Sequence, residues 1–186
     1  MRNLAVAWLL VIARTAAADT PHVEYAVRAG IGDANNADVD DSGIGPAIDV
    51  EVGARWRSVT VAGYATYFHF HDEPAPDYDL PQTVVDMRGN AVGGGGRVHL
   101  HIRHVFLGAG VGFEYWHEAG PEAPVCGDDG APSLPAFSQN RFYPVVELHA
   151  GYTFSRVGRV APQVMAVALG APNDMLGWRV LVGVQF

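Results

Sequence analysis

Residues 176–186, which read LGWRVLVGVQF, carry large apolar side chains on every even position. A period of two over this length predicts a β-strand with one apolar side. Each residue rises roughly 3.3 Å, so a strand of this length tilted near 45° reaches about 25 Å, the height of the apolar band on a transmembrane barrel. The stretch therefore predicts the last strand of a barrel that crosses a membrane.

The amino-terminal residues have the pattern of a secretory signal peptide. Arg2 precedes an apolar run at residues 4–13, and small residues follow at 16–18. The run is too short to span a membrane as a helix. We therefore expect residues 1–18 to be the signal peptide and residues 19–186 to form one domain, with the cleavage site uncertain by a few positions. No later apolar run is long enough to predict a helical membrane protein.

Composition narrows the class of protein further. All twelve basic residues are arginine, and the formal net charge is −8. An acidic chain without a basic patch argues against nucleic acid as a partner. The single cysteine, Cys126, cannot form an internal disulfide. Its simplest interpretation is a thiol tolerated in a loop, with intermolecular pairing or a reactive role as the alternatives.

Segments of alternating character recur along the chain. They cover residues 23–31, 48–56, 59–70, 85–102, 105–116, 146–154, 160–169 and 176–186. The third carries aromatic residues on both parities, the seventh contains Pro162, and the glycines at 93–96 in the fourth predict a β-bulge. An even number of strands is typical of single-chain bacterial barrels. We predict an all-β fold, an eight-stranded antiparallel up-and-down transmembrane barrel.

Short and long connections alternate between these segments. The short ones cover residues 56–59, 102–105 and 154–160, and the long ones cover 33–46, 71–83, 117–141 and 170–175. The long connections hold thirteen acidic residues and one arginine, whereas the short ones hold four arginines and no acidic residue. Short periplasmic turns and long external loops are typical of outer-membrane barrels. The pattern predicts acidic loops on the cell surface.

The polar and apolar faces of the segments separate a membrane barrel from a soluble one. In a soluble barrel of the lipocalin kind, the apolar face fills the interior and long charged side chains cover the outside. Here the polar faces are rich in Gly, Ala and Thr, and the apolar faces of the clean segments carry no charged residue. A cationic residue on the lipid side costs about 2–4 kcal/mol at the bilayer midplane. We therefore predict that the apolar faces point outward.

With its signal peptide, eight strands, loop asymmetry and terminal Phe186, the chain resembles the small bacterial outer-membrane barrels of the OmpA/OmpX kind. The resemblance covers essentially the whole chain after residue 18, and no motif identifies a subfamily. In that family the final aromatic residue belongs to the insertion signal. The resemblance implies a Gram-negative outer-membrane protein that is inserted by the barrel-assembly machinery as a single module.

An eight-stranded barrel is just wide enough to be filled by side chains. We expect twelve polar residues to point inward: Glu24, Arg28, Asp49, Glu51, Arg55, Arg97, His99, His101, Glu114, Glu147, His149 and Arg179. Buried charges need partners, which favours a packed polar lumen closed by Arg–carboxylate pairs. The alternative is a narrow porin-like channel.

Two patterns suggest metal ions. His99 and His101 share a face, and Glu147 with His149 could complete a Zn or Cu site, although histidines paired with carboxylates are the simpler explanation. In the first long connection, Asp38, Asp40, Ser42, Gly43 and Asp49 approximate a calcium loop. The alternative is a solvated acidic loop. We assign no metal ligand and no cofactor.

An enzyme of the outer leaflet, a lipid-modifying hydrolase or acyltransferase, would need a nucleophile and a base. His69, His71 and Asp72 lie together, with Ser133 and Ser138 in the third long connection. Their spacing fixes no catalytic geometry, so we assign no catalytic residue. The sequence favours a monomer with a structural or surface-interaction role, whose partners are outer-membrane lipid and lipopolysaccharide.

Overall fold

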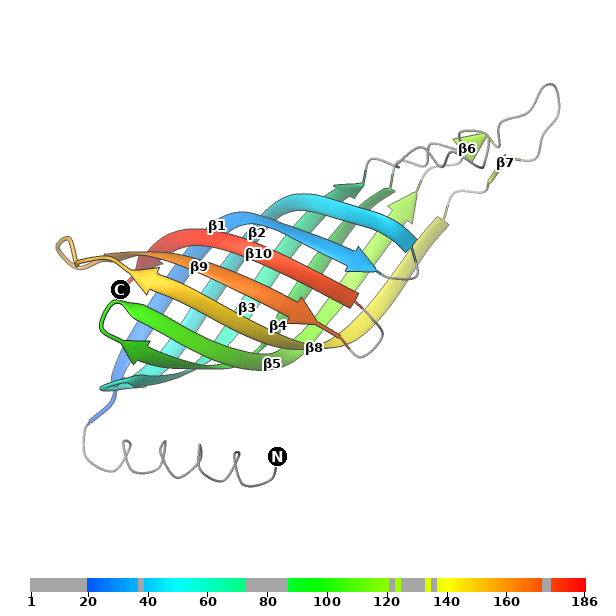
Figure 1. Ribbon diagram of the computed structural model, residues 1–186. Coiled ribbons are helices and arrows are strands. Elements are labelled where there is room, and N and C mark those ends of the chain that lie inside the picture. Colours follow the sequence, from blue (N-terminus) through cyan, green and yellow to red (C-terminus); the bar gives the residue numbers. More distant parts are fainter. Residues whose placement is uncertain are drawn as a thin grey trace.

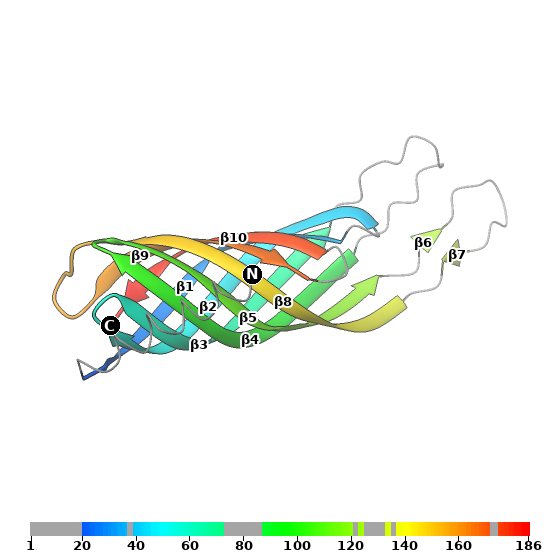
Figure 2. The same cartoon turned by 60° about the horizontal axis from the view of Figure 1, so that its bottom comes forward.

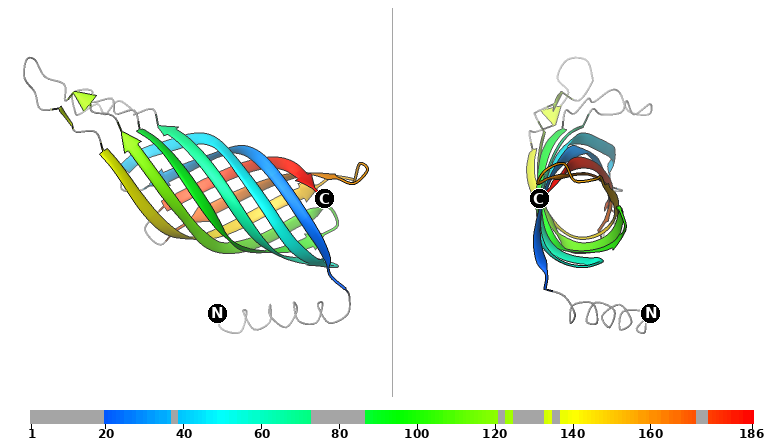
Figure 3. Two further views of the ribbon diagram at one scale, coloured as in Figure 1. Left: turned by 180° about the vertical axis from the view of Figure 1, so that it is seen from behind. Right: turned by 90° about the vertical axis from the view of Figure 1, so that its left-hand side faces the viewer.

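The computed structural model describes residues 20–36, 39–72, 87–120, 123–124, 133–134, 137–171 and 175–186. Eight strands close into a barrel in the order β1-β10-β9-β8-β5-β4-β3-β2, and every neighbouring pair is antiparallel (Figures 1 and 3). They are β1 (His22–Asn36), β2 (Val39–Trp56), β3 (Val59–Asp72), β4 (Met87–Ile102), β5 (Val105–Gly120), β8 (Phe137–Thr153), β9 (Ala161–Gly170) and β10 (Met175–Gln185). The predicted fold class is confirmed. No helix in the described ranges is long and apolar enough to cross a membrane.

The two ends of the barrel differ. The turn end holds the two-residue turns between β2 and β3 and between β4 and β5, together with the start of β1 and the end of β10. Each turn places an arginine in the left-handed region, Arg57 at φ 43° and Arg103 at φ 60°, where glycine is usual. At the opposite loop end, β6 (Ala123–Pro124) pairs with β7 (Ser133–Leu134) beyond the barrel (Figure 2).

The first hairpin, formed by β1 and β2, is longer than the segments in which polar and apolar residues alternate. The connection predicted at residues 33–46 is wrong, since β1 continues to Asn36 and β2 begins at Val39, with Asp33 opposite Ile44. Ladder hydrogen bonds join backbone groups, so strands can continue past the apolar band with polar side chains. The register of this pair shifts once, between Asn35 and Asn36.

The β-bulge predicted at the glycines of β4 is absent. The pairing of β4 with β3 and with β5 is continuous from Arg88 to Leu100. Gly93 and Gly95 point inward, where a Cβ on Gly95 would meet the Tyr64 ring at 3.0 Å. These glycines leave room for bulky side chains from β3 and β5. They obscure the alternation of polar and apolar residues in the sequence, but the strand pairing continues through them.

The apolar faces point outward, as the sequence predicts. In β10, Val182 is 60 % exposed whereas its neighbour Leu181 is 1 % exposed. The same outward exposure occurs in the other clean strands, for example at Val27, Val52, Leu107 and Leu148.

The lumen is not polar throughout. The prediction of a polar lumen is wrong for the half near the loop end, where Phe68, Phe70, Trp116 and Tyr143 form one apolar cluster with Leu169. The Phe70 and Trp116 rings lie 5.0 Å apart. In β3 the inward parity carries large aromatic residues, and in β9 it carries Met165 and Val167. Sequence alternation failed there because both faces of these strands are apolar.

Candidate functional site

The polar half of the lumen, near the turn end, contains a group of charged side chains that contact one another. Of the twelve polar residues predicted to point inward, ten are buried, and Arg55 and His101 are half-buried. Five of them make up what we call the ion network, namely Arg28, Asp49, Glu51, Arg97 and Glu147. They come from β1, β2, β4 and β8.

The two guanidinium groups of the ion network share the same carboxylates. Arg28 Nη1 lies 2.7 Å from Asp49 Oδ1, and Arg97 Nη1 lies 2.6 Å from Asp49 Oδ2. Glu51 Oε2 lies 3.2 Å from Arg28 and 3.3 Å from Arg97. Arg97 Nε also donates to Glu147, while its guanidinium carbon lies 3.8 Å from the Tyr64 ring centroid. Two guanidinium groups thus lie among three buried carboxylates, and each charge of the network contacts at least one opposite charge.

Two histidines lie beside the ion network. His149 Nε2 lies 2.9 Å from His99 Nδ1. The second nitrogen of each ring lies near a carboxylate. His99 Nε2 lies 3.1 Å from Glu51 Oε1, and His149 Nδ1 lies 3.8 Å from Glu147 Oε1. The imidazoles therefore lie between two carboxylates of the network.

The strand β5 lies between β4 and β8, yet side chains of β4 and β8 meet across it. The reason is that three alternate residues of β5, all facing the lumen, are glycines. A Cβ on Gly110 would lie 2.5 Å from Glu147 Oε1, and one on Gly112 would lie 2.6 Å from the Tyr64 hydroxyl. His149 fills the corresponding space at Gly108. The sequence signal was available in the alternate glycines 108, 110 and 112, but it does not say which side chains fill the space.

A second buried pair lies between the ion network and the apolar cluster. Arg179 Nη2 donates to Glu114 Oε1, and Arg179 Nη1 donates to Thr66 Oγ1 at 3.1 Å. The other oxygen of Glu114 accepts from Trp116 Nε1 at 3.1 Å. This carboxylate therefore connects the polar half of the lumen to the aromatic half.

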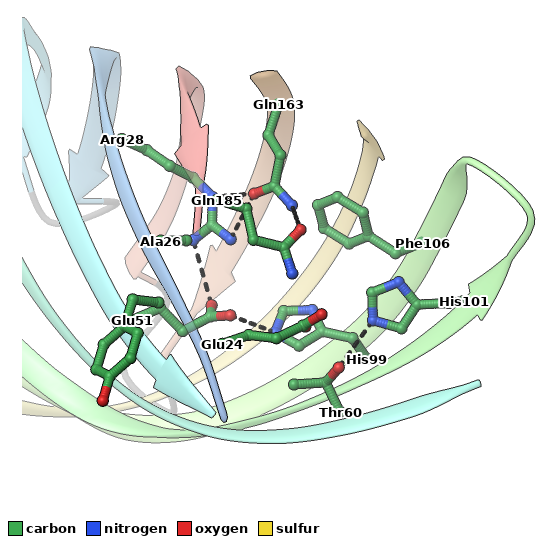
Figure 4. A pocket seen from close by; sticks show the side chains of 11 residues that line it. Glu24, Ala26, Arg28, Glu51, Thr60, His99, His101, Phe106, Gln163 and Gln185 are labelled. Atoms are coloured by element: carbon green, nitrogen blue, oxygen red, sulfur yellow. Dashed lines mark hydrogen bonds and ion pairs between the residues drawn. The ribbon is translucent and has the colours of Figure 1, made fainter. Parts of the chain in front are cut away.

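Two cavities lie on the turn-end side of the ion network. The inner one, of about 10 Å³, is lined by residues that include Glu24, Arg28 and Glu51 (Figure 4), and that volume suits one water molecule. The outer one, of about 230 Å³, lies at the turn end and shares Glu24, His101 and Gln185 with the inner cavity. Beyond the inner cavity, Arg28, Arg97 and their carboxylates occupy the lumen.

The structure corrects the calcium hypothesis. Asp49 is 1 % exposed and binds both arginines of the ion network, so its carboxylate is not a ligand for an ion in the first loop. Asp38 and the side chains of Asp40 and Ser42 lie outside what the structure describes. His99 and His149 do meet, but no group of three metal-binding side chains occurs among the described residues.

The residues considered for an enzyme are not brought together as far as the structure describes them. His69 Nδ1 pairs with Asn90 Oδ1 at 2.9 Å, and among the described residues no serine or cysteine side chain hydrogen-bonds to this histidine. Ser138 is exposed. The side chains of His71, Asp72 and Ser133, and the whole of Cys126, lie outside the described set.

Comparison with known proteins gives a likeness of fold. Neither a protein-family model nor a curated protein matches the sequence. Neisserial surface protein A matches with a TM-score of 0.52 at 14 % identity, over 90 % of this chain and 98 % of that one. Ail, the attachment invasion locus protein of Yersinia pestis, in complex with the heparin analogue sucrose octasulfate, matches with a TM-score of 0.53 at 13 % identity, over 89 % and 99 %. The chain therefore has the fold of the small eight-stranded outer-membrane β-barrels.

Proposed function

We propose that this protein spans the outer membrane of a Gram-negative bacterium as a monomer and displays acidic loops at the cell surface. The observation that supports this most is the distribution of side chains, with apolar residues outward and a buried ion network inside. Outward aromatic residues occur near both ends, such as Tyr25 and Phe154 at the turn end and Phe113 and Phe142 toward the loop end, which matches interfacial girdles.

The proposed orientation follows from the connections. The short turns, with Arg57, Arg103, Arg156 and Arg159, face the periplasm, and the acidic long connections face outward. Insertion then requires the barrel-assembly machinery, and the surrounding lipids include lipopolysaccharide.

The role that fits this arrangement is surface interaction or support of the envelope. The Ail structure contains a polyanionic heparin analogue. In this chain, by contrast, the spans 33–46, 71–83, 117–141 and 170–175 hold thirteen acidic residues and one arginine. Acidic loops repel a polyanion and attract cationic groups. We therefore propose that the loops contact cationic partners, or lipopolysaccharide phosphates through divalent cations.

A gel assay combined with fractionation tests the location and the closed barrel. The protein is expected in the outer-membrane fraction and should migrate differently in unheated and boiled detergent samples, because a closed ladder of hydrogen bonds resists detergent until it is heated. Recovery in the periplasmic or cytoplasmic soluble fraction, or identical migration before and after boiling, would contradict the proposal.

The second candidate function is a narrow channel, which the cavity of about 230 Å³ at the turn end favours. The ion network and the apolar cluster oppose it, because they fill the lumen between that cavity and the loop end. Recordings in planar bilayers are expected to show no discrete conductance steps. Reproducible conductance steps that disappear when a bulkier side chain replaces Arg156 at the turn end would establish the channel instead.

A further inference from the structure

We propose that the cavity at the turn end, called here the vestibule, binds a phosphate dianion, either free or as the phosphomonoester of a lipid. The vestibule has a volume of about 230 Å³. Its titratable lining residues are Glu24, Arg55, His101, Arg103, His104 and Arg156. In the orientation proposed above it opens toward the periplasm. Neither the surface role of the loops nor the structural role of the barrel requires such a site.

The charges around the vestibule do not balance. Three guanidinium groups face one carboxylate. Arg55 Nη1 lies 3.1 Å from Glu24 Oε1, so this arginine is already paired. Arg103 and Arg156 have no carboxylate partner among the described residues. The arginines and the one carboxylate of the lining therefore leave two uncompensated positive charges, and an anion in the cavity would compensate them.

The imidazoles on this lining have defined partners. His104 Nδ1 donates to the Thr153 carbonyl at 3.0 Å, which leaves its Nε2 for another partner. His101 Nε2 pairs with Thr60 Oγ1 at 2.9 Å. These hydrogen bonds fix the ring positions at the vestibule, and the second nitrogen of each ring makes no hydrogen bond to another described side chain.

A phosphate dianion fits this lining better than a carboxylate does. The charge of a phosphomonoester at neutral pH is about −1.5 to −2, which matches two free guanidinium groups, whereas a carboxylate or a phosphodiester carries one negative charge. Guanidinium groups bind phosphate oxygens through paired, charge-assisted hydrogen bonds. The cavity has room for the anion together with bridging water molecules.

The same turns supply a matched control. Arg57 and Arg103 occupy corresponding positions in the two-residue turns and share a positive φ, but only Arg103 lines the vestibule. Arg156 and Arg159 belong to one turn, and only Arg156 lines the vestibule. The double variants R103Q/R156Q and R57Q/R159Q therefore remove equal charge from the same end of the barrel.

The test titrates inorganic phosphate into the full barrel in phosphatidylcholine nanodiscs and follows binding by calorimetry. A second arm measures, by native mass spectrometry, how much phosphatidate the protein retains over phosphatidylglycerol. We expect R103Q/R156Q to bind phosphate or phosphatidate about tenfold or more weakly than the unaltered protein, because two charge-assisted contacts are lost. The R57Q/R159Q variant is expected to bind like the unaltered protein.

The outcomes separate the sources and the alternatives. Calorimetric binding of inorganic phosphate identifies the free dianion as ligand, and selective retention of phosphatidate identifies the lipid. Equal weakening in both double variants would overturn the proposal, since diffuse charge would then explain binding. Absence of binding to either probe would also overturn it. If R103Q/R156Q does not fold, the backbone amide chemical shifts of the unaltered protein, measured by NMR during the phosphate titration, decide whether phosphate binds at the vestibule. Phosphate must then shift His104 and Ser155 while leaving Gly158 unchanged, and any other pattern rejects the site.

Discussion

Replacing Arg97 by methionine is expected to lower the free energy of unfolding by about 3–5 kcal/mol. Arg97 is 2 % exposed and contacts Asp49, Glu51 and Glu147. Methionine keeps much of the side-chain volume but leaves buried carboxylates with fewer cationic partners, and an uncompensated buried charge is costly. Urea-induced unfolding in lipid vesicles, monitored by the loss of unheated gel mobility, measures the difference.

Two further variants show whether the loss of unfolding free energy comes from the ion network. Arg159→Met removes an exposed arginine at the turn end and is expected to change the free energy of unfolding little. Adding Glu147→Gln to Arg97→Met should restore part of the stability, because one uncompensated carboxylate is then neutral. If Arg97→Met unfolds at the same urea concentration as Arg159→Met, the ion network does not stabilise the barrel.

Replacing Gly110 by valine is expected to cost at least about 3 kcal/mol. A Cβ at this position would lie 2.5 Å from Glu147 Oε1 and 2.8 Å from its Cγ. Valine would therefore displace Glu147 from its contact with Arg97. The same urea assay measures the cost.

The neighbouring residue provides the control for this substitution. Ala109 is exposed on the outward face of β5, so Ala109→Val places the same final side chain next to Gly110 without entering the lumen. It is expected to leave the unfolding midpoint close to that of the unaltered protein. Equal effects of the two substitutions would show that β5 tolerates no added bulk on either face, and would remove the evidence for contact across Gly110.

The architecture could be predicted from the sequence because the outward faces are regular. In β10 and β5 every second residue is apolar, and these strands have the predicted parity. The prediction was wrong where the lumen itself is apolar. Phe68 and Phe70 on β3, and Met165 and Val167 on β9, point inward, and a period of two is invisible when both faces are apolar.

The contacts within the lumen could be predicted only in part. The sequence identified the buried charged residues, but a strand pattern does not say how far a side chain reaches around a barrel. The contact between His99 and His149 depends on Gly108 of the strand between them. The vestibule was missed because its lining comes from separate turns and strand ends, which share no sequence pattern.

The outward direction of the apolar faces is tested most directly by tryptophan quenching in bilayers with brominated acyl chains. Trp178 is 38 % exposed on β10, and Trp116 is 6 % exposed in the apolar cluster of the lumen. Two single-tryptophan variants, with the other tryptophans replaced by phenylalanine, place the fluorophore on either side of the barrel wall. If the apolar faces contact lipid, brominated chains will quench Trp178 strongly and Trp116 weakly. Equal quenching, or stronger quenching of Trp116, would contradict the outward orientation on which the proposed function depends.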